Sequence, residues 1–221
     1  MLKGVEDYLN ELKAKKITAL GANADTAELV RILGERPRVE KLAIKDVKLR
    51  TFITDDEHRD DMVTHVYDIT YGTVNPGVDN VVVIDDSIVR GTTLKKSIIR
   101  MLDRLNPKHI VVVSSAPQIR FPDCYGIDMA KIQDFIAFKA ATALLEERGL
   151  WHVITDAYAE AKNLEKQGLL HTKNCAKQVY EPFTYEEISD KIAELVSPPD
   201  VKAKVSVVYQ SVENLHKACP L

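Results

Sequence analysis

Short apolar runs set the pattern in the middle of the chain. The runs at residues 81–84 and 110–113 are apolar at every position, without the alternation of a strand that has one face in water. Between them, apolar residues recur at helical spacing, and Asn106-Pro107 ends that helix; they are Leu94, Ile98, Ile99, Met101, Leu102 and Leu105. The order strand, helix, strand predicts a βαβ unit whose parallel strands are buried on both faces.

Helical signals flank this unit on both sides. Asp25 followed by Glu28, and Thr184 followed by Glu187, have the spacing of a capping box at a helix start. Gly149 stands where glycine commonly ends a helix, after the predicted helix at 131–148. The pattern predicts helices over about 2–16, 26–34, 131–148 and 185–197, and strands over 48–53 and 202–209.

These signals divide the chain into three parts. Residues 1–48 form a predicted helical N-terminal segment, residues 49–149 the core with the βαβ unit, and residues 150–221 a C-terminal extension of helices and a strand. Together the elements predict an α/β fold with an open, mostly parallel sheet and flanking helices.

Composition narrows the classes of function. With 221 residues, of which 45% are hydrophobic and 29% charged, the chain has the balance of a soluble globular protein with one core. A net charge of -3 provides no general basic field for nucleic acid. No apolar run reaches the ~18 residues of a membrane span, and the first residues do not resemble a signal peptide, so we expect a cytoplasmic protein. Three widely spaced cysteines favour free thiols over a disulfide framework.

The run VVVIDDSIVRGTT, residues 81–93, carries the candidate chemistry. Asp85 and Asp86 come at the carboxyl end of a predicted parallel strand, where open α/β sheets bind ligands. The turn after them opens into a helix and therefore offers hydroxyls, backbone N–H groups and the positive end of a helix dipole to a phosphate. We expect Gly91 to let the backbone approach that phosphate. The turn is neither a Walker loop nor the G-x-G-x-x-G of dinucleotide binders.

Two carboxylates beside a phosphate would repel it, unless they face hydrogen-bond donors or a cation. A ribose 5-phosphate meets this condition, because its 2′ and 3′ hydroxyls can donate to Asp85 and Asp86 while its phosphate lies on the amides of residues 90–93. The alternative is an acidic turn that only caps the following helix, but capping needs one such residue rather than two. The pattern favours ribose phosphate, with Mg²⁺ nearby where a pyrophosphate is attached.

The same run resembles the signature that binds phosphoribosyl pyrophosphate (PRPP) in the type I phosphoribosyltransferases. Within them, the form DDSIVRGTT is typical of the glutamine amidophosphoribosyltransferase family. Two other segments are similar to that family: SSAPQIRFPDCYGIDM at residues 114–129 and RTFI at residues 50–53. The resemblance extends from residue 50 to about residue 138.

The resemblance implies a role for each matching residue. Asp85 and Asp86 would hold the ribose diol and support Mg²⁺, and residues 87–93 would enclose the 5′-phosphate. The implied substrate-binding set is Asp85, Asp86, Ser87, Ile88, Val89, Arg90, Gly91, Thr92 and Thr93. The implied catalytic residues are Arg50, Thr51 and Arg59, at and within the loop that closes over the site.

The family also implies a reaction and partners. The reaction forms 5-phosphoribosylamine from PRPP and ammonia in purine synthesis, the ammonia coming from glutamine in a separate glutaminase domain. Purine nucleotides would inhibit at the same pocket, and we expect a homo-oligomer. Cys124 stands where iron-sulfur members have a ligand, but three cysteines cannot complete a four-cysteine cluster, so we expect none.

Several parts of the family pattern differ here. The loop at residues 54–72 is rich in acidic residues, and Val66 stands where the family has a lysine. A pyrophosphate-contacting strand end is not recognisable in residues 1–48, and residue 1 is methionine rather than the cysteine nucleophile of a glutaminase. We therefore expect a piece of a longer enzyme, weak or inactive by itself.

Two other functions remain open. A catalytically impaired module that binds PRPP or nucleotides for regulation would explain the acidic loop, although a basic DNA-binding segment is not apparent. A transferase that acts on a free base is disfavoured by the Ile-Val-Arg-Gly form of the turn.

Overall fold

The computed structural model describes residues 2–21, 25–40, 42–45, 67–123 and 129–219. They fall into two compact units, Met1–Leu42 and Ala43–Leu221. In the first unit, α1 (Leu2–Leu20) contacts α2 (Thr26–Gly34). Lys13 is buried there and donates to the carbonyl of Leu33 at 3.4 Å. Helix α1 is one turn longer than predicted. Asp25 caps α2 through the amide of Ala27, but the predicted capping box with Glu28 is not formed, because the Glu28 carboxylate accepts from Arg31 instead.

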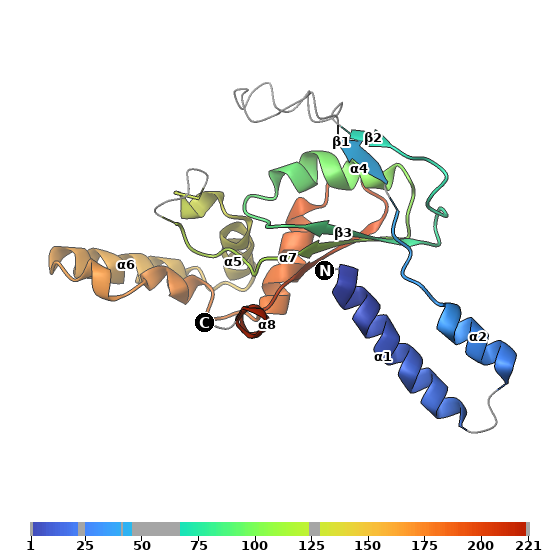
Figure 1. Cartoon of the computed structure of the whole chain (residues 1–221). Helices are drawn as coiled ribbons and strands as arrows, with labels where there is room; N and C mark the ends of the chain where they lie inside the picture. Colours follow the sequence, from blue (N-terminus) through green and yellow to red (C-terminus); the bar gives the residue numbers. More distant parts are fainter. Residues whose placement is uncertain (1, 22–24, 41, 46–66, 124–128, 220–221) are drawn as a thin grey trace. The chain divides into compact units, whose positions relative to one another are not determined.

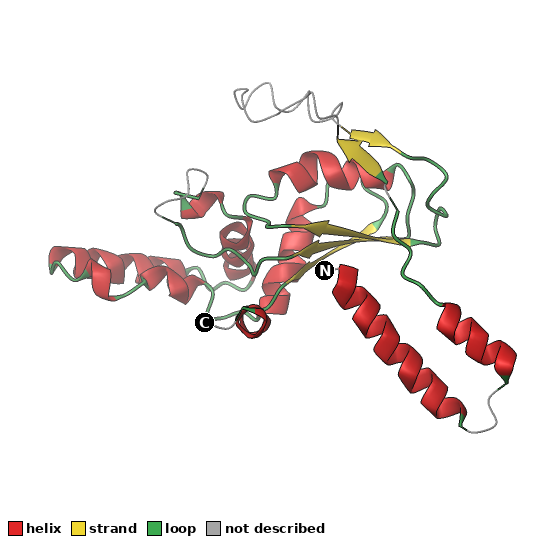
Figure 2. Cartoon of the chain, viewed as in Figure 1, coloured by secondary structure: helices red, strands yellow, loops and turns green. Residues whose placement is uncertain are grey.

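Among the described residues of the second unit, three parallel strands form one sheet (Figures 1 and 2). Strands β3 (Asn80–Asp85), β4 (His109–Ser114) and β5 (Lys204–Tyr209) lie in the order β3-β4-β5. A separate antiparallel pair joins β1 (Ala43–Lys45) and β2 (Tyr67–Ile69). The predicted α/β fold with a parallel sheet and flanking helices is confirmed. The strand predicted at 48–53 lies outside the described residues.

Helices connect and flank the strands. Residues 92–103 form one continuous helix. Its middle part, η1 (Leu94–Ile98), is a π-helix, and its last part is the α-helix α4 (Ile99–Asp103). The later helices are η2 (Ile132–Asp134), α5 (Ile136–Glu147), α6 (His152–Lys166), η3 (Leu170–Thr172), η4 (Cys175–Val179), α7 (Tyr185–Val196) and α8 (Val212–Ala218). The predicted capping box at the start of α7 is present in full. Among the described residues, no helix has the length and apolar character needed to cross a membrane.

The core lies on one face of the sheet. Helix α4 contacts β4, α7 contacts β5, and α7 also contacts η1, so both helices cover the same face. Beneath them Ile110 and Val112 are fully buried. On the opposite face Val82, Ile84 and Val208 are 60%, 44% and 49% exposed. The prediction that these strands are buried on both faces is therefore wrong, because their apolar residues alternate between a covered face and an open one.

Candidate functional site

The two predicted carboxylates lie at the carboxyl end of β3. Asp85 is the last residue of the strand and pairs in register with Ser114 of β4. The carbonyls of Asp85 and Asp86 accept hydrogen bonds from the amides of Ser115 (2.9 Å) and Ala116 (3.0 Å). The hydroxyl of Ser115 also donates to the Asp85 carbonyl at 2.8 Å. Parallel pairing thus continues beyond the strands and fixes the backbone that carries both carboxylates.

The side chains of Asp85 and Asp86 stand in different surroundings. Asp85 is half-buried on the covered face of the sheet, and its Oδ1 accepts from the amide of Asp86 at 3.0 Å. Burial raises the pKa of Asp85, and the nearby charge of Asp86 adds to that rise. Asp86 is exposed, and its Oδ1 accepts from the amide of Ser87 at 2.6 Å. In each carboxylate one oxygen accepts from the local backbone, and no N–H or hydroxyl group of the described residues donates to the second. The two carboxyl groups also interact with each other, which contributes to the raised pKa of Asp85.

The turn after the carboxylates is anchored to the start of α5. Ile88 is buried, with 3% of its surface exposed. The carbonyl of Val89 accepts from the amide of Ile136 at 2.8 Å, and the guanidinium of Arg90 lies 4.0 Å from the carboxylate of Asp134. The buried side chain of Ile88, the hydrogen bond to Val89 and the ion pair of Arg90 therefore hold the turn in place.

Gly91 adopts a backbone conformation that favours glycine, with φ at +70°. A Cβ atom at this position would lie 2.9 Å from Cγ1 of Val196 and 3.4 Å from Cγ1 of Ile136. The missing side chain thus faces α7 and α5, in the interior. Close packing therefore requires glycine here, and the approach of the backbone to a phosphate stays a prediction.

A helix begins immediately after Gly91. The carbonyl of Gly91 accepts the first bond, from the amide of Lys95 at 3.0 Å. First-turn amides of a helix have no acceptor within the helix and lie at the positive end of its dipole. Thr92 and Thr93 are exposed in that first turn. Together with Ser87 they provide hydroxyls beside a helix start, a kind of position where anions bind in proteins, a short distance along the chain from two carboxylates.

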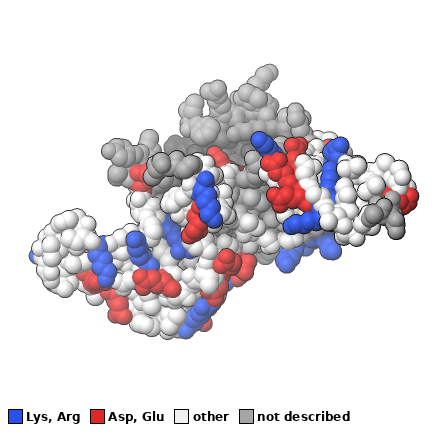
Figure 3. All heavy atoms as spheres, turned by 60° about the horizontal axis from the view of Figure 1, so that its bottom comes forward, with Lys and Arg blue, Asp and Glu red and all other residues white. Residues whose placement is uncertain are grey.

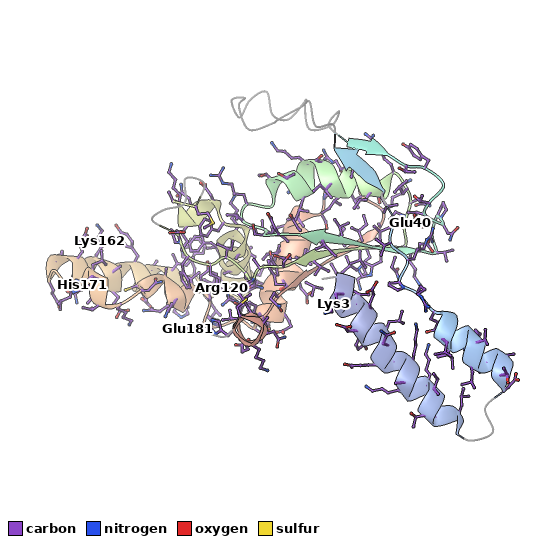
Figure 4. All side chains as sticks on the ribbon, viewed as in Figure 1. Lys3, Glu40, Arg120, Lys162, His171 and Glu181 are labelled. Carbon is purple, nitrogen blue, oxygen red and sulfur yellow. The ribbon has the colours of Figure 1, made fainter. Side chains whose placement is uncertain are left out.

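The segment that follows β4 is fastened to α7 by polar and aromatic contacts. The side-chain amide of Gln118 donates to the carbonyl of Tyr185 at 2.8 Å. The guanidinium of Arg120 lies 4.9 Å from the ring centre of Tyr180 and 4.1 Å from that of Tyr185, beside the start of α7 (Figure 4). Burial lowers the pKa of Arg120. These contacts hold the chain that supplies the amides of Ser115 and Ala116 to the site.

Some of the predicted residues cannot be placed. Arg50, Thr51, Arg59 and Cys124 lie outside the described residues, so their predicted roles stay predictions. Conversely, sequence reasoning missed the supporting residues, which are Ser115, Ala116, Asp134, Ile136 and Val196. Their only sequence signal was that some fall in or near the segment that resembles the family.

Two other features of the surface do not compete with this site. On the face drawn in Figure 3, described basic side chains are interspersed with acidic ones, which agrees with the lack of a general basic field.

A depression of about 410 Å³ beside α6 is lined by Ala161, Leu170, His171, Lys173, Asn174, Cys175 and Ala176. Lys173 in that depression is already paired with Glu160 at 2.5 Å. Within the described ranges, no three His, Cys, Asp or Glu residues are grouped to hold a metal ion.

Comparison with known proteins finds partial similarity to one kind of enzyme. The chain is 46% identical over 63 residues to an amidophosphoribosyltransferase of Pseudomonas aeruginosa, a match that covers 28% of this chain and 12% of that protein. The corresponding enzyme of Escherichia coli is 50% identical over 58 residues, covering 26% and 11%. That of Schizosaccharomyces pombe is 34% identical over 91 residues, covering 39% and 17%.

These matches confirm the resemblance over part of the chain. They cover less than a fifth of the length of these relatives. No protein-family model matches the chain. The likeness is therefore regional, and it agrees with part of a phosphoribosyltransferase domain.

Proposed function

We propose, on the premise that part of this chain is related to amidophosphoribosyltransferases, that it binds PRPP and other ribose 5-phosphates at the turn formed by residues 85–93. One observation carries this proposal. Two carboxylates, each with one oxygen that accepts no hydrogen bond from the described backbone or side-chain donors, and the start of a helix stand at the two ends of a single anchored turn. A ribose 5-phosphate has hydroxyl donors at one end and an anion at the other, so it matches both groups at once.

Each part of the turn has a separate task in this proposal. In Asp85 and Asp86, the carboxylate oxygens that do not bond the backbone accept hydrogen bonds from the 2′ and 3′ hydroxyls of the ribose. The amides at the helix start and the hydroxyls of Thr92 and Thr93 donate to the 5′-phosphate. Anchoring of the turn to α5 holds these groups at a fixed separation before the ligand arrives.

The donor set also fits Mg²⁺ in a substrate-bound form. Mg²⁺ usually takes one or two carboxylates and completes its shell with water and substrate phosphates. Asp85 and Asp86 supply two carboxylates, and no larger cluster of ligands is grouped in the described part of the chain. When bound, the ion would neutralise the charge of the pyrophosphate.

The proposed reaction needs no side-chain nucleophile. Ammonia forms a bond to C1 of the ribose while the bond from C1 to the pyrophosphate oxygen breaks, and the added nitrogen then loses a proton to solvent. Catalysis would therefore rest on positioning and on stabilising the leaving pyrophosphate. The names of the relatives support this reaction for the proteins that carry them.

A second function is favoured by acidic residues in the segment that the sequence predicts to close over the site; its predicted range, 54–72, includes strand β2 at residues 67–69, and residues 54–66 lie outside the described ones. Asp55, Asp56, Glu57, Asp60 and Asp61 would repel a polyanion that the loop enclosed. The alternative proposal is a module that binds PRPP or a nucleotide without turning it over.

Calorimetric titration with ribose 5-phosphate, and with PRPP in the presence and absence of Mg²⁺, tests the binding site. Asp85→Asn or Asp86→Asn should weaken binding by ~10- to 100-fold, the effect of one hydrogen bond to a charged group. Asp156→Asn makes the same change of charge at an exposed position on α6 and should leave binding unchanged. Absence of heat from the folded wild-type protein at millimolar ligand would refute the proposal.

Release of pyrophosphate separates the two functions. The assay supplies PRPP, Mg²⁺ and ammonium chloride at alkaline pH. Turnover that is lost in Asp86→Asn and kept in Asp156→Asn supports the transferase. Tight binding of PRPP without turnover supports the binding module.

A further inference from the structure

The side chain of Tyr209 carries a buried hydroxyl group. Tyr209 is the last residue of β5 and lies mostly buried, and its hydroxyl is shielded from solvent without a hydrogen-bond partner in the part of the chain that the structure describes. A buried hydroxyl that makes no hydrogen bond costs free energy, whereas phenylalanine would fill the same space without that cost. The hydroxyl therefore requires an explanation.

The position of Tyr209 in the sheet relates it to Asp85. Asp85, Ser114 and Tyr209 stand side by side in register across β3, β4 and β5, so their side chains project from the same face. This is the face that α4 and α7 cover, and the row is at the carboxyl edge where the candidate site lies. Strands are spaced by ~4.8 Å, which puts the outer two Cα atoms about 10 Å apart.

Ser114 stands between Asp85 and Tyr209 in this row. It is the smallest of the three residues and is fully buried. Its hydroxyl donates to the carbonyl of Ala116 at 2.9 Å, so its hydrogen is directed to the backbone rather than to either neighbour in the row. The long side chain of Tyr209 has its donor at the far end of the ring, which suits a reach across this small residue. Asp85 is half-buried, and no N–H or hydroxyl group of the described residues donates to its second oxygen.

We propose that Tyr209 is a positioning residue of the ribose phosphate site, whose hydroxyl donates to the second oxygen of Asp85 or to one water bound between them. One such contact satisfies a buried donor and a half-buried acceptor together. It orients the Asp85 carboxylate toward the ribose hydroxyls, whereas the helix start that holds the phosphate is untouched. The proposal rests on the ribose phosphate function above, and it adds a residue from outside the segment that resembles the family.

A double-mutant cycle tests the contact without any ligand. The variants are Tyr209→Phe, Asp85→Ala and the two together, compared by urea unfolding. A partnerless hydroxyl predicts that Tyr209→Phe is neutral or stabilising. The proposal predicts a loss, about tenfold in the unfolding equilibrium constant, that largely disappears in the Asp85→Ala background. Additive effects of the two changes overturn the proposal. Tyr71→Phe, at an exposed tyrosine, is the matched control and should change nothing.

Ligand binding tests the role in the site. Tyr209→Phe should weaken ribose 5-phosphate about tenfold and leave inorganic phosphate unaffected, because only the ribose meets Asp85. Equal loss for both ligands, or no loss for either, overturns the positioning role. If the wild-type protein binds neither ligand, the ribose phosphate function fails, and with it the positioning role, while the unfolding cycle still decides whether the contact exists.

Discussion

Replacing Gly91 by alanine probes the packing that supports the candidate site. The change adds one Cβ atom at φ +70°, 2.9 Å from Cγ1 of Val196. The left-handed conformation costs a residue with a side chain roughly 1–2 kcal/mol, and overpacking a well-filled interior costs typically ~1–3 kcal/mol more. The expected loss is therefore about 2–5 kcal/mol, a large part of the ~5–15 kcal/mol that stabilises a typical domain.

The two contributions can be separated by a second substitution. Val196 is 1% exposed, so Val196→Ala by itself should cost about 2 kcal/mol through the cavity it leaves. That cavity accepts the Cβ atom added at position 91. The double variant should consequently be more stable than the sum of the single changes by ~1–3 kcal/mol, while the backbone cost remains.

Urea unfolding followed by circular dichroism measures these free energies, and titration with ribose 5-phosphate measures binding by the folded fraction. Because the added Cβ faces the interior, binding by folded Gly91→Ala should change only a few-fold. Unchanged stability with abolished binding would refute the reasoning, since it would place the ligand rather than Val196 beside that Cβ. Independent effects of Gly91→Ala and Val196→Ala would refute the proposed collision.

Three more predictions concern the scaffold. Thr184→Ala removes the N-cap of α7 and should cost ~0.5–2 kcal/mol in urea unfolding. A hydrogen bond from Arg148 is the main cause that lowers the pKa of Glu187 in the folded protein. The ionised Glu187 should therefore stabilise the fold above its unfolded pKa of ~4.3, and this stabilisation should be lost as the pH falls below that value. Glu187→Gln should flatten this part of the curve of unfolding free energy against pH. Ile110→Ala should cost ~2–5 kcal/mol by denaturation, whereas Val82→Ala, on the open face, should stay near ±0.5 kcal/mol; equal losses would show that the open face is covered in solution.

Local signals in the sequence determined the elements that surround the site. Strand β4, residues 109–114, contains the apolar run 110–113 that predicted it, and the helix after Asp85 and Asp86 begins within the Gly-Thr-Thr turn. The capping box at Thr184 was also identified correctly. Such features depend on residues a few positions apart, so hydrophobic spacing and capping chemistry are sufficient to predict them. These local features alone predicted that two carboxylates and a helix start lie close to each other along the chain.

Only the tertiary structure decided how these elements are supported. Whether an apolar strand is covered on one face or two depends on where distant helices pack, and here α4 and α7 share one face, which leaves Val82 exposed. The same packing brings Val196 against Gly91, more than a hundred positions earlier in the chain, and puts Tyr209 in one row with Asp85. Contacts of this kind are set by register and by the shapes of buried side chains. A local pattern carries no information about them, because the residues meet only after the chain has folded.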